Sequence, residues 1–178
     1  MRSWYGPDET REPWCFLALA PETNEGDASL TSWALGVGNA HQLVSTESQQ
    51  VQSNYKEADL LVALGEVLDS LRYTGATLVT PEERTIPRLR RRLLACAALQ
   101  SPTFRGFNHI VLEVILERYF DLTSLSELNK HSENQLFVET DDPTVTSHDR
   151  PNFVRQLWQV WTTIYRLVPV TACLGEPL

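Results

Sequence analysis

The stretch WCFLALA, residues 14–20, is a short and continuous apolar run. A run of this length without polar residues indicates a strand that is covered on both faces of its sheet. Two further strand-like runs follow at Leu30–Val37 and His41–Thr46, and Gly38 and Asn39 lie between them. Because glycine and asparagine tolerate the positive φ of a tight turn, we expect a hairpin beside the first strand.

The clearest helical pattern is Glu57–Leu71, where leucines and Val67 recur on one helical face. Gly75 follows this helix, and ATLVT, residues 76–80, is another short buried strand. A helix between two buried strands predicts a crossover connection between parallel strands. The chain is therefore predicted to be an α/β protein with a mixed sheet and helices on its faces.

The second half of the chain predicts one more strand and further helices. The expected ranges are Ile86–Leu99 (helix), Phe104–Phe107 (strand), His109–Phe120 (helix), a short helix opened by a capping box at Ser124 and Glu127, and about 152–168 (helix). The helix over Ile86–Leu99 is expected to turn Ile86, Leu89, Leu93 and Ala97 inward and several arginines outward.

With 178 residues, the chain has the size of one domain with its own core. Residues 1–13 are polar and contain Gly and Pro, which predicts a loosely held arm. Residues 14–178 are then a single domain, in which residues 131–150 form a long acidic loop before the C-terminal helix.

The charge balance is acidic and unusually poor in lysine. Fifteen Lys and Arg stand against 23 Asp and Glu, for a net charge of −8, and Lys56 and Lys130 are the two lysines. A salt-rich cytoplasm, as in a halophilic archaeon, favours such a surface, and a high-GC genome gives the same bias. A protein of this charge has no overall attraction for nucleic acid and needs a local basic patch to bind it.

The sequence predicts neither a metal-binding cysteine or histidine cluster nor a membrane segment. Cys15, Cys96 and Cys173 are far apart and are expected to be reduced thiols, and the four histidines are scattered. No run of about 18 apolar residues occurs, and charges interrupt the first 14 residues, where a signal peptide needs an apolar stretch. We expect a cytoplasmic protein without a membrane partner.

Three stretches of the chain resemble the motifs of one superfamily. The first, FLALAPET (16–23), is similar to a first strand bearing Asp-x-Glu-Thr. The second, LVTPEERTIPRLRRRL (78–93), is similar to a strand followed by a Leu-Pro-x-Leu-Arg-Arg-Arg helix. The third, residues 109–128, is similar to the helix after the fifth strand and the Ser-Leu turn beyond it. Together with the order of elements, they resemble the ribonuclease H-like fold in its DnaQ-like 3′–5′ exonuclease form. More specifically, they resemble the exonuclease-related domains of archaeal family B polymerases and their stand-alone relatives.

The resemblance also defines what is missing. Nucleases of this kind hold two divalent cations with four carboxylates that converge at strand ends. Ala20 stands where the first aspartate is expected, and Glu22 matches the second carboxylate, as a remnant ligand for Mg or Mn. The loop 81–85 aligns no aspartate, and Tyr165 is followed by Pro169 where the last motif needs one. The resemblance implies that the fold is kept and the nuclease is lost.

A cluster of arginines is the strongest remaining candidate for a binding surface. Its members, on one face of the second helix, are Arg84, Arg88, Arg91 and Arg92. Like charges at this spacing repel unless something neutralises them. Nucleic-acid phosphates would do so, but the acidic residues 131–150 or a protein partner are favoured. In the last helix, Trp161 is expected in the core, and Trp158 is a candidate exposed anchor for a partner.

Two functions follow from these observations. The first is a non-catalytic ribonuclease H-like binding or scaffolding module, without a cofactor, that serves a protein complex or nucleic-acid processing. The alternative is a divergent metal-dependent 3′–5′ exonuclease acting on DNA or RNA, with Mg or Mn held by Glu22 and by Glu82 and Glu83 as replacement carboxylates. The two differ in whether carboxylates converge at the end of the first strand.

Overall fold

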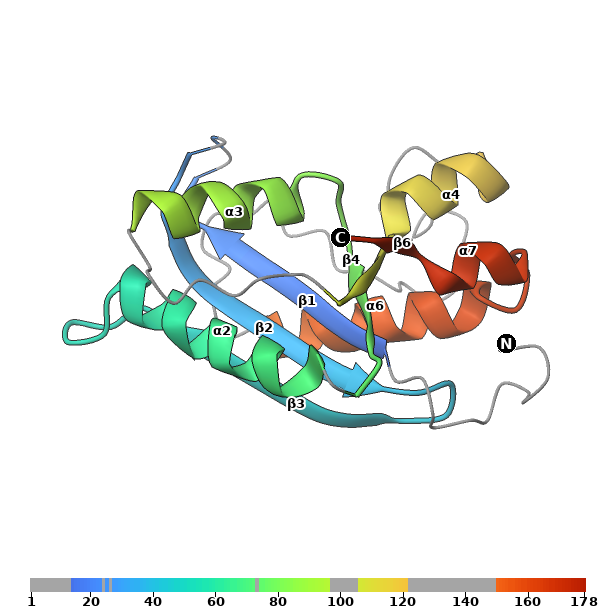
Figure 1. Cartoon of the computed structure of the whole chain (residues 1–178), viewed down its shortest axis with the longest axis horizontal. Coiled ribbons are helices and arrows are strands. Elements are labelled where there is room, and N and C mark those ends of the chain that lie inside the picture. The colour runs from blue at the N-terminus through green and yellow to red at the C-terminus, as the bar shows by residue number, and fades with distance from the viewer. Residues whose placement is uncertain (1–13, 24, 26, 73, 97–105, 122–149) are drawn as a thin grey trace.

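The computed structural model describes residues 14–23, 25, 27–72, 74–96, 106–121 and 150–178 (Figure 1). The strands of this part are β1 (Trp14–Pro21), β2 (Leu30–Gly38), β3 (Leu43–Gln50), β4 (Thr77–Thr80), β5 (Asn108–Val111) and β6 (Glu176–Pro177). The helices are α2 (Glu57–Arg72), α3 (Thr85–Ala95), α4 (Leu112–Phe120), α6 (Arg150–Ile164) and α7 (Val170–Leu174).

The described strands form one mixed sheet in the order β3-β2-β1-β4-β5-β6. The hairpin strands β2 and β3 extend the sheet from β1 in antiparallel fashion, whereas β4 and β5 run parallel to β1. The side chains of Cys15, Phe16, Leu17 and Ala18 are fully buried in β1, as a strand covered on both faces requires. The prediction of an α/β fold with a mixed sheet is confirmed.

Helices cover both faces of the sheet (Figure 1). Successive side chains of β1 point to opposite faces, so Cys15 and Leu17 pack against α2 and α3, while Phe16 and Ala18 pack against α6. The predicted leucine face of α2 is confirmed, since Leu60, Leu61, Leu64 and Leu68 are fully buried. On the opposite face, a Cβ at Gly36 of β2 would lie 2.5 Å from Val154 Cγ1, so glycine lets α6 approach the sheet closely.

The hairpin is present, but its turn works differently from the prediction. Neither Gly38 nor Asn39 has a positive φ. Instead, the turn closes through a hydrogen bond from the Asn39 N–H to the Gln42 carbonyl at 2.9 Å, and Asn39 Oδ1 accepts the N–H groups of His41 and Gln42. The second hairpin strand therefore starts at Leu43, two residues later than expected. An asparagine side chain takes the place of special backbone angles.

The strand predicted at Phe104–Phe107 and the helix predicted at His109–Phe120 are wrong at their boundaries. Residues 108–111 form β5, and α4 begins only at Leu112. The apolar run 110–112 fits a helix and a buried strand equally well, and pairing with β4 decides for the strand, with Ile110 in register with Val79.

The C-terminal region also differs from the prediction of one helix to residue 168. Helix α6 ends at Ile164, and the chain then forms α7 and the two-residue strand β6, which pairs with β5. Gly175, with φ of 69°, connects α7 to β6, and a Cβ there would lie 2.7 Å from the His109 carbonyl oxygen. The predicted arm at 1–13, the inward Ala97, the capping box at Ser124 and Glu127 and the loop residues 131–149 lie outside the described residues.

Candidate functional site

The end of β1 is where the resemblance implies a metal centre. Ala20 is 5% exposed and lies opposite Ser32 of β2, which is itself buried. Glu22 follows the strand with an exposed side chain, and its backbone N–H donates to the Ser29 carbonyl at 2.7 Å. The candidate ligand therefore lies on the turn that leads back into β2.

The other candidate carboxylates, Glu82 and Glu83, follow a strand that ends several residues before the end of β1. The register pairs Phe16 with Val79, so β4 ends beside Leu17, whereas Glu22 lies just past the end of β1, about five residues or roughly 16 Å of extended chain farther on. Glu82 and Glu83 follow the end of β4 directly. Across the residues that the structure describes, no three His, Cys, Asp or Glu side chains are grouped so that they could share a metal ion.

Arg92 of α3 is a structural residue rather than a free surface cation. Its Nε and Nη2 donate to the two carboxylate oxygens of Glu57 at 2.7 and 2.6 Å, and its Nη1 donates to the Asp27 carbonyl at 2.9 Å. The same Glu57 carboxylate accepts the Leu30 N–H at 2.9 Å. Burial opposes ionisation of Glu57, but the hydrogen bonds from Arg92 and Leu30 outweigh it and hold its pKa below the usual value. The contact ties α3 to α2 and to the start of β2.

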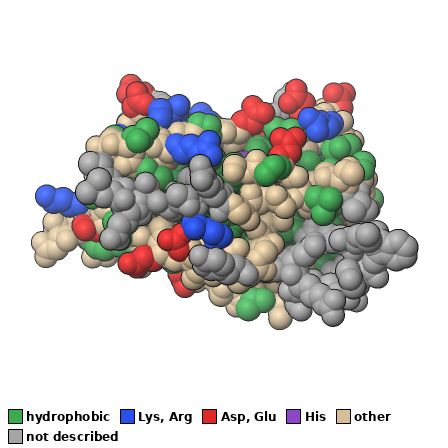
Figure 2. Space-filling model, in the orientation of Figure 1, with side chains coloured by type: hydrophobic (Ala, Val, Ile, Leu, Met, Phe, Trp, Pro, Cys, Tyr) green, Lys and Arg blue, Asp and Glu red, His purple; other side chains and the backbone are tan. Residues whose placement is uncertain are grey.

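The remaining arginines of the predicted cluster divide into two kinds. Arg84 is exposed and donates to Glu82, and Arg91 is exposed with its Nε 3.4 Å from Asp27 Oδ1. Arg88 is only 6% exposed, so the prediction that it faces outward is wrong. Burial, followed by repulsion from Arg84, lowers its pKa. Basic and acidic side chains lie close together over the α3 region (Figure 2).

Trp158 is not the exposed anchor that the sequence predicts. Its ring is partly buried against the core, and its indole N–H donates to the Asn39 carbonyl at 2.8 Å, which joins α6 to the β2–β3 turn. The prediction for Trp161 is confirmed, because it is fully buried and packs edge-on against Trp14 with ring centres 5.6 Å apart.

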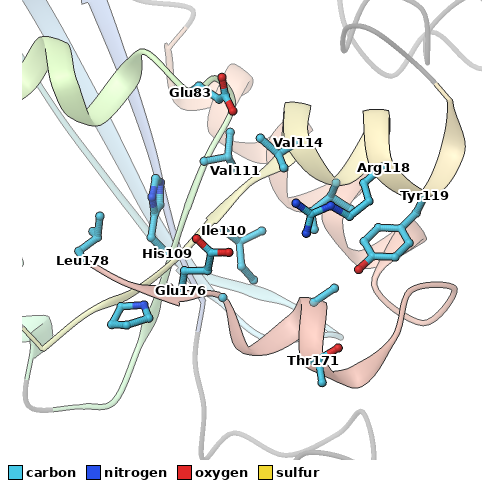
Figure 3. Close-up of a pocket in the computed structure, with 14 residues that line it drawn as sticks. Glu83, His109, Ile110, Val111, Val114, Arg118, Tyr119, Thr171, Glu176 and Leu178 are labelled. Atoms are coloured by element: carbon cyan, nitrogen blue, oxygen red, sulfur yellow. The ribbon is translucent and has the colours of Figure 1, made fainter.

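A cavity of about 520 Å³, called here the α4–α7 pocket, opens between β5, α4, α7 and β6 (Figure 3). Its apolar wall includes Ile110, Val111, Val114, Ile115 and Ala172. Its polar groups are Glu83, His109, Arg118, Tyr119, Thr171 and Glu176. Glu83 precedes α3, and the others come from β5, α4, α7 and β6, so the fold brings together segments that are far apart in the sequence.

His109 forms an uncharged polar part of this pocket. Its Nε2 lies 2.7 Å from Oγ1 of the buried Thr80 on the neighbouring strand β4. Burial, with a smaller contribution from the charge of Arg90, lowers the pKa of His109 to about 4. The imidazole is therefore neutral at neutral pH, and its bond to Thr80 fixes the orientation of the ring.

Sequence reasoning did not single out this pocket. Arg118 and Tyr119 belong to the RYF stretch, which entered only as part of the resemblance, and Glu176 belongs to a strand that was not predicted. The one available signal was a helix that places Arg118 one turn beyond the apolar Val114.

Comparison with family models and with curated proteins finds no relative. The resemblance to the ribonuclease H-like superfamily therefore rests on the residues and on the order of elements. None of the helices in the described ranges is long and apolar enough to cross a membrane.

Proposed function

We propose that this chain is a non-catalytic ribonuclease H-like module that binds a protein partner, within a protein complex or in nucleic-acid processing. The observation that carries the proposal is Ala20, which lies in the core at the end of the central strand β1. The resemblance implies an aspartate at this position, and a methyl group cannot ligate a metal ion. Binding is therefore favoured over catalysis.

The arrangement of strands supports the same proposal. A central strand, an antiparallel hairpin on one side and two parallel strands on the other follow the order of elements on which the resemblance rests. Helices α2 and α3 cover one face of this sheet and α6 the other. Because this kind of architecture carries many unrelated activities, the function must be argued from the surface and not from the fold.

Ion pairing within the chain supports a protein partner over nucleic acid. Carboxylates of the same chain already neutralise three arginines of the predicted cluster. The pairs are Arg84 with Glu82, Arg91 with Asp27, and Arg92 with Glu57. A phosphate backbone would have to compete with these carboxylates and with a net charge of −8.

The thiols support the proposed cytoplasmic location. Cys15, Cys96 and Cys173 are all free, and free thiols suit a reducing compartment. The proposed function uses no cofactor, whereas the nuclease alternative would use Mg or Mn at Glu22.

Nucleic-acid binding by the wild-type chain is expected to be weak, with a Kd of about 10 µM or higher for a single-stranded oligonucleotide at about 0.15 M salt. The variant Arg84→Glu/Arg91→Glu reverses two exposed charges of α3. We expect it to leave the salt dependence of binding unchanged, because these side chains face carboxylates. Fluorescence anisotropy across a salt titration measures both quantities.

The matched control is Lys56→Glu/Arg155→Glu, which makes the same change of net charge at exposed positions outside α3. Tight wild-type binding, together with a slope that falls by about 1.4 in the α3 variant alone, would show two phosphate contacts. That outcome would overturn the assignment to a protein partner.

A further inference from the structure

The floor of the α4–α7 pocket is apolar. Ile110 of β5 and Ile115 of α4 lie under it, but they are only 2% and 6% exposed and offer a ligand almost no surface. Val114 and Ala172 form its two sides and are only partly buried. Removing the exposed apolar surface of Val114 and Ala172 from water would favour an apolar side chain by about 25 cal/mol per Å².

Charged groups of both signs surround that floor. Arg118 and the Tyr119 hydroxyl point into the pocket from α4, and the Glu176 carboxylate approaches from β6 (Figure 3). The side chains of these three residues form no hydrogen bond or ion pair with the rest of the described chain. The pocket therefore offers a cation and a hydroxyl donor on one side and an anion on the other.

The size of the pocket suits a ligand larger than a few atoms. A volume of about 520 Å³ lies within the range of cavities that enclose drug-sized molecules or a few amino-acid residues. The pocket lies beside β6, which pairs only with β5 among the described strands and forms the edge of the sheet. An extended chain segment can reach such an edge more easily than it can reach the covered centre of the sheet.

We propose that the α4–α7 pocket binds a peptide segment of a protein partner, with an apolar side chain between Val114 and Ala172 and one acidic and one basic residue beside it. The acidic residue pairs with Arg118 and the Tyr119 hydroxyl, and the basic residue pairs with Glu176. Charge complementarity of this kind gives specificity more than affinity. This inference rests on the proposed function as a protein-binding module and names the surface that performs it.

Selection from a random heptapeptide library displayed on phage, with the full chain immobilised, tests the proposal. We expect the wild-type chain to enrich peptides that carry an apolar residue flanked by one acidic and one basic residue. Arg118→Glu should replace the enriched acidic residue with a basic one, and Glu176→Arg should replace the enriched basic residue with an acidic one. In calorimetry, each variant should bind the peptide selected by the wild type with a Kd about tenfold higher.

Arg155→Glu, an exposed charge reversal on α6 outside the pocket, is the control and should leave the enriched motif unchanged. If the library shows no enrichment, the proposal is overturned. This is the result expected if the pocket binds a small organic ligand or a second copy of this chain. Enrichment that neither pocket variant alters overturns it as well. In both cases the proposed function stands. Metal-dependent nuclease activity of the chain would instead overturn the proposed function, whatever peptides the selection enriches.

Discussion

Leu64→Asp is expected to leave the chain largely unfolded. Leu64 is fully buried in α2 against the face of the sheet that carries Leu17 and Trp33. An unpaired carboxylate at this position costs several kcal/mol, and the lost apolar contacts cost more. Because the whole free energy of unfolding of a domain is about 5–15 kcal/mol, this one change removes most of it.

Urea unfolding followed by circular dichroism measures the effect, and Val62→Asp is the matched control. Val62 lies in the same helix with 36% of its surface exposed, so an aspartate there stays in water. We expect the control to differ from the wild type by less than about 1 kcal/mol. Equal unfolding midpoints for the two variants would mean that α2 does not pack with its leucine face on the sheet.

Arg92→Ala is expected to lower the free energy of unfolding by about 2–3 kcal/mol. The side chains of Arg92 and Glu57 are only 15% and 14% exposed, so loss of the guanidinium leaves a mostly buried carboxylate without its partner. The loss should be greatest at neutral pH. The pKa of Glu57 is lowered in the folded chain, so its stabilising contribution is present above the ordinary carboxylate pKa and is lost as the pH falls through the folded value.

The control for this prediction is Arg91→Ala, one residue earlier on α3. Arg91 is 49% exposed and its partner Asp27 is 89% exposed, so the pair contributes less than about 0.5 kcal/mol. Adding Glu57→Gln to Arg92→Ala should recover part of the lost stability, because it removes the buried charge. If Arg91→Ala destabilises the chain as much as Arg92→Ala, the two arginines do not differ in role.

The elements that sequence reasoning placed correctly are those with a strong local pattern. Strand β1 and helix α2 are each defined by a continuous apolar run or by a single helical face, and burial follows the pattern residue by residue. Strand β5 was misplaced because its apolar residues continue directly into α4, and only pairing with β4 divides them. The short strand β6 depends on Gly175 and on contact with β5, and no local pattern of two residues predicts it.

The role of the arginines could not be read from their spacing. Helical spacing predicted Arg84, Arg88, Arg91 and Arg92 on one face, but their partners are set by the tertiary fold. Arg92 binds Glu57, which is 35 residues away, and the carbonyl of Asp27, which is 65 residues away. The α4–α7 pocket was missed for the same reason, because its walls come from segments between Glu83 and Leu178.

The measurement that tests the central claim most directly is digestion of end-labelled single-stranded DNA and RNA by the purified chain in Mg²⁺ and in Mn²⁺. Since Ala20 supplies no metal ligand at the end of β1, we predict no product above the metal-free control. Glu22→Ala and the neighbouring exposed control Glu25→Ala should behave as the wild type does. Shortening of the substrate from its 3′ end, abolished by Glu22→Ala in a folded protein and retained in Glu25→Ala, would contradict a non-catalytic module.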